Sequence, residues 1–147
     1  MQQKERKTLK QNRFPTLLRE IPSPPKELYV IGDLPNEDKI WLAVVGTRKF
    51  SNYGKEVCEK IIEGLKGHNF VIVSGLALGI DSIAHRAAIE NNLPTVAVPG
   101  SGLDEKVLHP HFLTDILVMA RNRRPRIFEA SQECHFQVFS FRILFDI

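Results

Sequence analysis

Three short apolar runs, each ending at a glycine loop, constrain the fold of this chain more than any other feature of its sequence. The runs are WLAVV, FVIV and TVAV, at 41–45, 70–73 and 95–98, and they stop at Gly46, Ser74-Gly75 and Pro99-Gly100. Continuous apolar runs rich in Val and Ile are typical of parallel strands that are buried on both faces. We therefore expect three parallel strands whose carboxyl ends carry the loops.

The segments between these runs have helical periodicity. Each has one apolar stripe with polar residues opposite: Val57, Cys58, Ile61, Ile62 and Leu65 in the first segment, and Ile80, Ile83, Ala84, Ala87 and Ala88 in the second. Asp81 or Ser82 stands at a natural N-cap position of the second helix. Residues 40–100 thus predict a β-α-β-α-β unit with right-handed crossovers. The expected fold class is α/β, a Rossmann-like open parallel sheet with flanking helices that is incomplete at its C-terminal end.

The flanking segments differ from this core. Residues 14–36 hold five prolines and predict an extended lead-in that packs a few side chains and forms no helix. After residue 120, four arginines fall within six positions, and no strand-turn-helix pattern follows. We expect this tail to pack poorly, because the final strands of the sheet are not encoded there. The predicted organisation is a basic, proline-rich lead-in at 1–39, an α/β domain at 40–120 and a divergent basic tail at 121–147.

Charge and composition exclude several classes of protein. The formal net charge of +3 divides into +4 over residues 1–20, −3 over 21–120 and +2 over 121–147. A general basic coat for nucleic acid is therefore absent, and any anion site in the middle must be built locally. No apolar run reaches about 18 residues, which argues against a transmembrane helix. The N-terminus has no apolar h-region after its charges, and we expect a cytoplasmic protein without membrane contact.

Neither a metal nor a cofactor is expected. Two cysteines are too few for a zinc site, and the five histidines show no ligand spacing with a carboxylate. There is no G-x-G-x-x-G after the first strand. Gly46 and Gly54 are eight residues apart, and Lys55 is followed by Glu56, so the P-loop pattern also fails.

The three glycine loops nevertheless predict an anion site. GTRKFSNYG (46–54), SGLALGID (74–81) and PGSGLD (99–104) all follow strands, so they lie together at the carboxyl edge of the sheet. Helix N-termini and close backbone approach at glycine favour phosphate there. Arg48 is the expected anion contact, and Ser74 and Ser101 are expected donors through hydroxyl or backbone.

Two pairs of residues leave alternatives open. Asp81 and His85 are four apart on one helix face, and a hydrogen-bonded pair that fixes the loop is favoured over a catalytic pair. Phe50 and Tyr53 either stack on bases or pack against the first helix.

At these loops the sequence resembles a known family. VVGTRKFSNYG, VIVSGLALGIDSIAHRAAI and TVAVPGSGLD, with FPTLLREIPSPPKELYVIGD upstream, are similar to the DNA-processing protein A family, also called the Smf family. The resemblance covers about residues 14–110. It implies a bacterial cytoplasmic protein of natural transformation that binds single-stranded DNA, protects incoming strands, loads the RecA recombinase onto them and forms homodimers. It also implies a binding protein rather than an enzyme.

The resemblance further implies a set of site residues. They fall on the three loops, as Gly46, Thr47, Arg48, Ser74, Gly75, Gly79, Gly100, Ser101 and Gly102, with structural roles for Asp81 and His85. After about His109 the sequence departs from the family pattern, because the next strand and a basic loop are missing. This departure predicts a domain that is truncated, with a shifted reading frame as one explanation. Whether dimerisation and RecA contact survive is left open.

Two rival functions share the same layout. Phosphoribohydrolases of the lysine-decarboxylase-like family cleave nucleoside monophosphates and carry a Pro-Gly-Gly-x-Gly-Thr loop followed by a catalytic Glu. Here Pro99-Gly100-Ser101-Gly102 takes that place, the Thr is absent and Glu105 is too near the loop. The other rival is a nucleotide-sensing module without catalysis.

Overall fold

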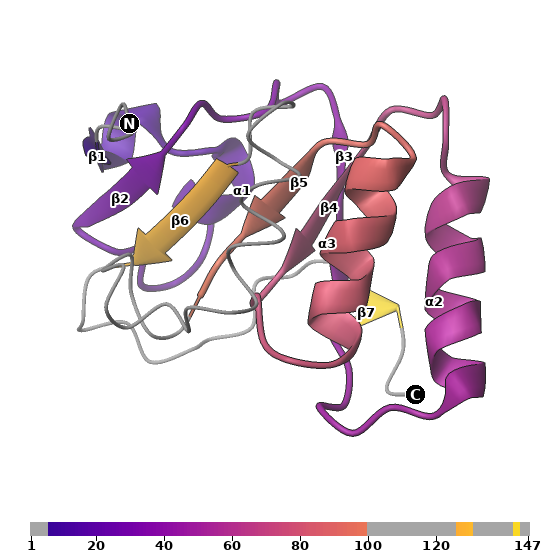
Figure 1. Ribbon diagram of the computed structural model, residues 1–147. Coiled ribbons are helices and arrows are strands. Elements are labelled where there is room, and N and C mark those ends of the chain that lie inside the picture. The colour runs from indigo at the N-terminus through magenta and orange to yellow at the C-terminus, as the bar shows by residue number, and fades with distance from the viewer. Residues whose placement is uncertain (1–5, 100–125, 131–142, 145–147) are drawn as a thin grey trace, which may run out of the picture.

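The strands of this protein form one mixed sheet. In the computed structural model residues 6–99, 126–130 and 143–144 are described, and the sheet order among them is β1-β2-β6-β5-β4-β3-β7 (Figure 1). Strands β3, β4, β5, β6 and β7 pair with one another in parallel, whereas β2 is antiparallel to both β6 and β1. The strand bounds are Arg6–Lys10 (β1), Glu27–Ile31 (β2), Ile40–Val44 (β3), Phe70–Ser74 (β4), Thr95–Ala97 (β5), Arg126–Ala130 (β6) and Ile143–Leu144 (β7).

Two helices connect the central strands. Helix α2 (Asn52–Gly64) joins β3 to β4, and α3 (Ile80–Glu90) joins β4 to β5. They lie side by side on one face of the sheet (Figure 1). The predicted β-α-β-α-β unit is confirmed, and so is the α/β fold class. No helix among the described residues is long and apolar enough to cross a membrane.

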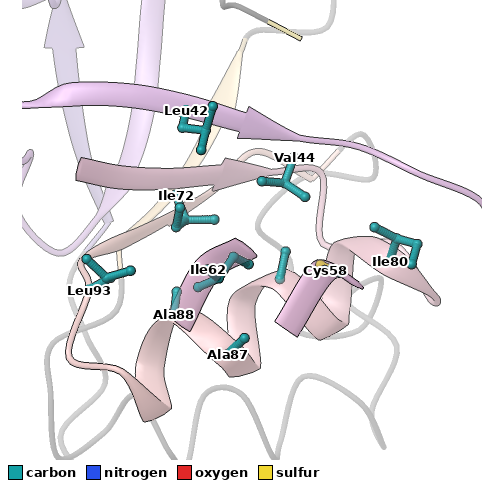
Figure 2. Close-up of a cluster of buried hydrophobic side chains, with 10 residues drawn as sticks. Leu42, Val44, Cys58, Ile62, Ile72, Ile80, Ala87, Ala88 and Leu93 are labelled. Atoms are coloured by element: carbon teal, nitrogen blue, oxygen red, sulfur yellow. The ribbon is translucent and has the colours of Figure 1, made fainter. Parts of the chain in front are cut away.

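The core on the helix side is built from alternate strand residues. Leu42 and Val44 of β3 and Ile72 of β4 are buried against the two helices, where Ile62 of α2 is fully buried (Figure 2). Eight of the eleven residues of α3 are buried, and three of them are alanines, whose short side chains let the helix lie close to the sheet. This packing fixes where α3 begins relative to β3, which matters for the loops described below.

The lead-in covers the opposite face of the sheet. Val71 and Val73 alternate with Ile72 and therefore point away from the helices. Phe14, Leu18, Leu28 and Val30 from the lead-in bury them. The expectation that this segment packs a few side chains is confirmed.

The expectation of an extended, helix-free lead-in is wrong in part. It supplies β1 and β2, a 3-10 turn (Gln11–Arg13) and the one-turn helix α1 (Thr16–Arg19). Pro15 precedes α1 at its N-cap position, where a missing backbone N–H costs nothing. Proline therefore bounds this short helix instead of preventing it.

The tail contributes strands that the sequence did not predict. Arg126–Ala130 forms β6 between β5 and β2, and Ile143–Leu144 pairs with β3 as β7. The expectation that no strand is encoded after residue 120 is wrong for these two segments. The sequence argument relied on glycine boundaries, and RIFEA has none, although its Ile and Phe suit a strand. The rest of 100–147, with the arginine-rich segment at 121–125, lies outside the described residues.

Candidate nucleic-acid interface

The loops after β3 and β4 meet at the carboxyl edge of the sheet, where α2 and α3 begin (Figure 1). The backbone N–H of Ile80 donates to the carbonyl oxygen of Thr47 at 3.2 Å. In the same contact the N–H of Gly46 donates to a carboxylate oxygen of Asp81 at 3.4 Å. The loop after β3 is thus held by the first turn of α3.

Glycine is required where these loops touch. Gly79 has φ +97°, and a Cβ built on it would lie 2.2 Å from the Thr47 carbonyl oxygen and 2.7 Å from the Arg48 Cα. A Cβ on Gly46 would lie 2.7 Å from the Cβ of Ile80. No real side chain tolerates such separations, so these glycines serve the contact of one loop with the other. Their spacing in the sequence reflects this contact at least as much as any ligand.

The buried carboxylate of Asp81 connects the loop after β3 with the loop after β4. The residue is 5% exposed, and its carboxylate accepts from Gly46 N–H and from Ala77 N–H, both at 3.4 Å. It is the second residue of α3, because Gly79 occupies the N-cap position without a side-chain cap. The prediction of Asp81 or Ser82 as the N-cap is therefore wrong. A carboxylate in the first turn suits the helix dipole, so the anion at this end of α3 is the protein's own side chain.

Replacing Asp81 by alanine should lower the free energy of unfolding by about 1–2 kcal/mol, because two partly buried N–H groups, of Gly46 and Ala77, lose their acceptor. Both hydrogen bonds are long, which places the loss in the lower part of the usual range. Urea denaturation measures it, with Asp38→Ala as the control, since Asp38 is exposed. Equal stability of Asp81→Ala and the unsubstituted chain would remove Asp81 from this role.

His85 does not pair with Asp81, contrary to the expectation. Its Nδ1 lies 2.7 Å from the hydroxyl oxygen of Thr95, and that hydroxyl donates to the carbonyl oxygen of Ile72 at 3.0 Å. Both contacts are satisfied when Nδ1 carries the proton and donates to Thr95. The residue is 1% exposed, and burial lowers the pKa of its imidazole to about 4 against a smaller opposing effect of the Ser74 carbonyl. A neutral ring shielded in this way fastens α3 to the sheet and reaches no ligand.

Ser74 is also turned toward the sheet. Its buried hydroxyl donates to the carbonyl oxygen of Val44 at 2.7 Å and so joins the ends of β4 and β3. This contradicts the expectation that the Ser74 hydroxyl donates to a ligand, whereas a donor role for the Ser74 backbone stays a prediction. Gly75 follows, partly buried, and a Cβ on it would lie 3.0 Å from a carboxylate oxygen of Asp81.

Arg48 is exposed, and within the described part of the chain its guanidinium has no hydrogen-bond or ion-pair partner. The loop that carries it is ordered by its own contacts, because the N–H of Lys49 donates to the Thr47 hydroxyl at 3.1 Å. Residues 45–55 contain Arg48, Lys49 and Lys55 and no acidic residue. An unpaired cation on a braced loop is a suitable contact for an anion.

The structure describes some of the remaining expected residues and not others. Gly100, Ser101 and Gly102, on the third loop, lie outside the described residues. Phe50 and Tyr53 are exposed, which decides against the alternative that they are buried against α2. Across residues 6–99 and the two short strands, no three His, Cys, Asp or Glu side chains gather as metal ligands would.

Sequence reasoning missed Thr95, whose hydroxyl orients His85. It begins an apolar run, and nothing local distinguishes it from its neighbours.

Comparison with known proteins identifies the family. The family model described as DNA recombination-mediator protein A matches residues 6–117. The chain is 43% identical over 95 residues to Protein Smf of Synechocystis sp., an alignment that covers 62% of this chain and 24% of that protein. It is 46% identical over 91 residues to DNA processing protein DprA of Streptococcus pneumoniae, covering 62% of this chain and 32% of that protein.

Solved structures give the same result. The X-ray structure of DNA processing protein A from Streptococcus pneumoniae matches with a TM-score of 0.69 and 34% identity, over 85% of this chain and 44% of that one. The Helicobacter pylori protein, described for its single-stranded DNA binding mode, matches with a TM-score of 0.69 and 28% identity, over 85% and 55%. The chain spans about a quarter to a third of the length of the two curated relatives. Because the family model covers well over half of its residues, the chain belongs to the DNA recombination-mediator protein A family.

Proposed function

We propose that this chain binds single-stranded DNA at the carboxyl edge of its sheet and that Arg48 is the principal phosphate contact. The observation that carries the proposal is the unpaired, exposed guanidinium of Arg48 on a loop braced by Thr47, Gly79 and Asp81. A guanidinium offers a planar fork of donors that fits phosphate oxygens. A braced loop loses little conformational entropy on binding, which leaves more of the contact energy for affinity.

In this proposal the other expected residues divide into those that border the DNA site and those that support it. Thr47 and Gly75 border the edge with Arg48, whereas Gly46, Ser74 and Gly79 support it from within through the contacts described above. Gly100, Ser101 and Gly102 complete the site in the proposal, on the resemblance of their loop to the family. Asp81 and His85 hold the scaffold and do not touch DNA.

We also propose the biological setting that the family suggests. The chain acts in DNA uptake during natural transformation, in the cytoplasm, where it protects incoming strands and delivers them to RecA as part of a homodimer. Names of relatives as DNA processing proteins support the setting. The proposal is a binding role without catalysis. Its support is that Asp81 and His85, the pair most suited to acid–base chemistry, are buried and engaged in structural hydrogen bonds.

Arg48→Ala should weaken binding to labelled oligo-dT by about 1.5–3 kcal/mol, the range for a charge-assisted hydrogen bond. The loss should be similar for other base sequences, because phosphates carry no sequence information directly. The slope of log affinity against log salt should fall by about 0.7, the value for one phosphate contact on a single strand. Fluorescence anisotropy at several salt concentrations measures both quantities.

The matched control is Lys66→Ala, which removes an exposed cation beyond the far end of α2. It should leave affinity unchanged. Equal affinity and equal salt slope for Arg48→Ala and the unsubstituted chain would contradict the proposal. Release of a free base from a nucleoside monophosphate by the purified chain would favour the phosphoribohydrolase alternative instead.

A further inference from the structure

Two aromatic side chains stand exposed beside Arg48. Phe50 is 42% exposed and Tyr53 is 70% exposed. Phe50 immediately precedes Ser51, the N-cap of α2, and Tyr53 is the second residue of that helix, so both flank one helix start. Large aromatic side chains contribute most to stability when buried, and these two are not.

The local structure explains why the fold does not bury them. The Ser51 hydroxyl accepts from Gly54 N–H at 3.1 Å and caps α2 without help from either ring. A hydrophobic residue before the N-cap often packs on the fourth helical residue, but that position is Lys55. Tyr53 lies next to the buried stripe of α2, which begins at Gly54 and continues through Cys58 and Ile62. Neither aromatic residue belongs to the packed clusters of the described chain.

The surroundings of the two rings are apolar and cationic at once. Leu78 is exposed on the neighbouring loop, next to Gly79, which contacts Thr47 and Arg48. The stretch from 45 to 55 carries three cations and no acid, and since Lys55 pairs with Glu59 at 3.8 Å, Arg48 and Lys49 supply its positive charge. A partner that suits such a surface is an anionic polymer with accessible flat rings. A single strand of nucleic acid meets both requirements, whereas the ring faces of a duplex are covered by neighbouring base pairs.

We propose that Phe50 and Tyr53 form a stacking platform for unpaired bases next to the phosphate contact of Arg48. This inference rests on the proposed function and adds the reason why the site selects single strands over duplex. Arg48 holds the backbone, and the rings engage base faces, which every base offers. Binding is therefore strand-selective and tolerant of sequence.

The test compares three labelled ligands of equal length by anisotropy: oligo-dT, a fully abasic strand with the same phosphates, and a duplex. Phe50→Ala and Tyr53→Ala should each weaken oligo-dT binding at least about fivefold, the lower limit for losing one stacked base. Both should bind the abasic strand as the unsubstituted chain does. Arg48→Ala should lose affinity for both single strands.

Control variants separate stacking from general damage. Tyr53→Phe keeps the ring and should keep affinity, whereas Tyr53→Leu keeps apolar bulk and should lose it. Leu17→Ala removes an exposed apolar side chain from α1, on the other side of the sheet, and should change nothing. Both aromatic side chains are exposed, so urea midpoints should stay unchanged in all these variants.

The possible results are distinct. If the unsubstituted chain binds oligo-dT but the aromatic variants lose nothing, or lose equally on the abasic strand, the stacking platform is refuted and the phosphate site stands. If the duplex binds as tightly as oligo-dT, strand selection at this surface is refuted. If the unsubstituted chain does not bind oligo-dT, both the platform and the proposed function fail.

Discussion

Gly79→Ala should lower the free energy of unfolding by about 2–6 kcal/mol, the largest stability loss that we expect from a single methyl group in the described residues. Two costs add. A backbone with φ +97° and ψ −135° lies in a region almost restricted to glycine, which costs about 1–3 kcal/mol for alanine. The new Cβ would also meet the Thr47 carbonyl oxygen at 2.2 Å, and relief of such overpacking costs about another 1–3 kcal/mol.

Two other glycines separate these costs. Gly67 has φ +81° with no atom within 4 Å of a built Cβ, so Gly67→Ala carries the backbone cost alone. Gly64, the last residue of α2, has neither a positive φ nor a neighbour, and alanine there should stabilise by about 0.5–1 kcal/mol. Urea denaturation should show the free energy of unfolding decreasing in the order Gly64→Ala, Gly67→Ala and Gly79→Ala. A Gly79→Ala chain as stable as Gly67→Ala would show that the loops separate without cost.

The buried imidazole of His85 should make the protein less stable as the pH falls. Its pKa is about 4 when folded and near 6.5 when unfolded, so between these values the unfolded chain binds a proton that the folded chain does not. The stabilisation is complete above pH 6.5 and is lost as the pH decreases through this window. The loss reaches about 3 kcal/mol at pH 4, of which about 2 kcal/mol appears by pH 5.

Urea denaturation between pH 7 and 5 measures this dependence before most carboxylates titrate. His85→Gln should flatten the slope, and it leaves the hydroxyl of Thr95 bonded to the carbonyl of Ile72. His68→Gln removes an exposed histidine instead and should leave the slope in place. A slope that persists in His85→Gln would assign the acid sensitivity to other groups.

The central unit was predictable because its signals are local. The strands β3, β4 and β5 fall on continuous apolar runs, and the buried stripe of α2 recurs every four residues, at Gly54, Cys58 and Ile62. Burial on both faces and helical periodicity leave a direct trace in the chain. The position of Arg48 on an exposed loop just after β3 was predictable for the same reason, whereas its role as an anion contact stays a prediction.

The remaining structure depends on partners far away in the chain. Strand β6 forms because the edges of β5 and β2 are available for pairing on either side of it. No residue within β6 indicates these two partners. Sequence spacing predicted Asp81 as a helix cap because capping is a local interaction, but its carboxylate oxygens accept from the N–H groups of Gly46 and Ala77 on two loops. His85 contacts Thr95 and not Asp81, because the face of α3 that carries His85 is turned toward β5. Such pairings follow from the packing of α3 on the sheet, which sequence spacing does not contain.

The antiparallel pairing of β2 with β6 has a consequence for synthesis of the chain. Leu28 pairs with Ala130, about 100 residues later, whereas β1 pairs with β2 across 25 residues or fewer. A ribosome adds about 5–20 residues per second, so β2 waits roughly 5–20 seconds for its second neighbour. During that interval the whole β3–β5 unit emerges and can condense. Strand β1 meanwhile covers the other edge of β2, and its Lys7 and Lys10 pair with Asp33 and Glu27, so the edge of β2 that later receives β6 is the position that a nascent-chain chaperone would have to protect.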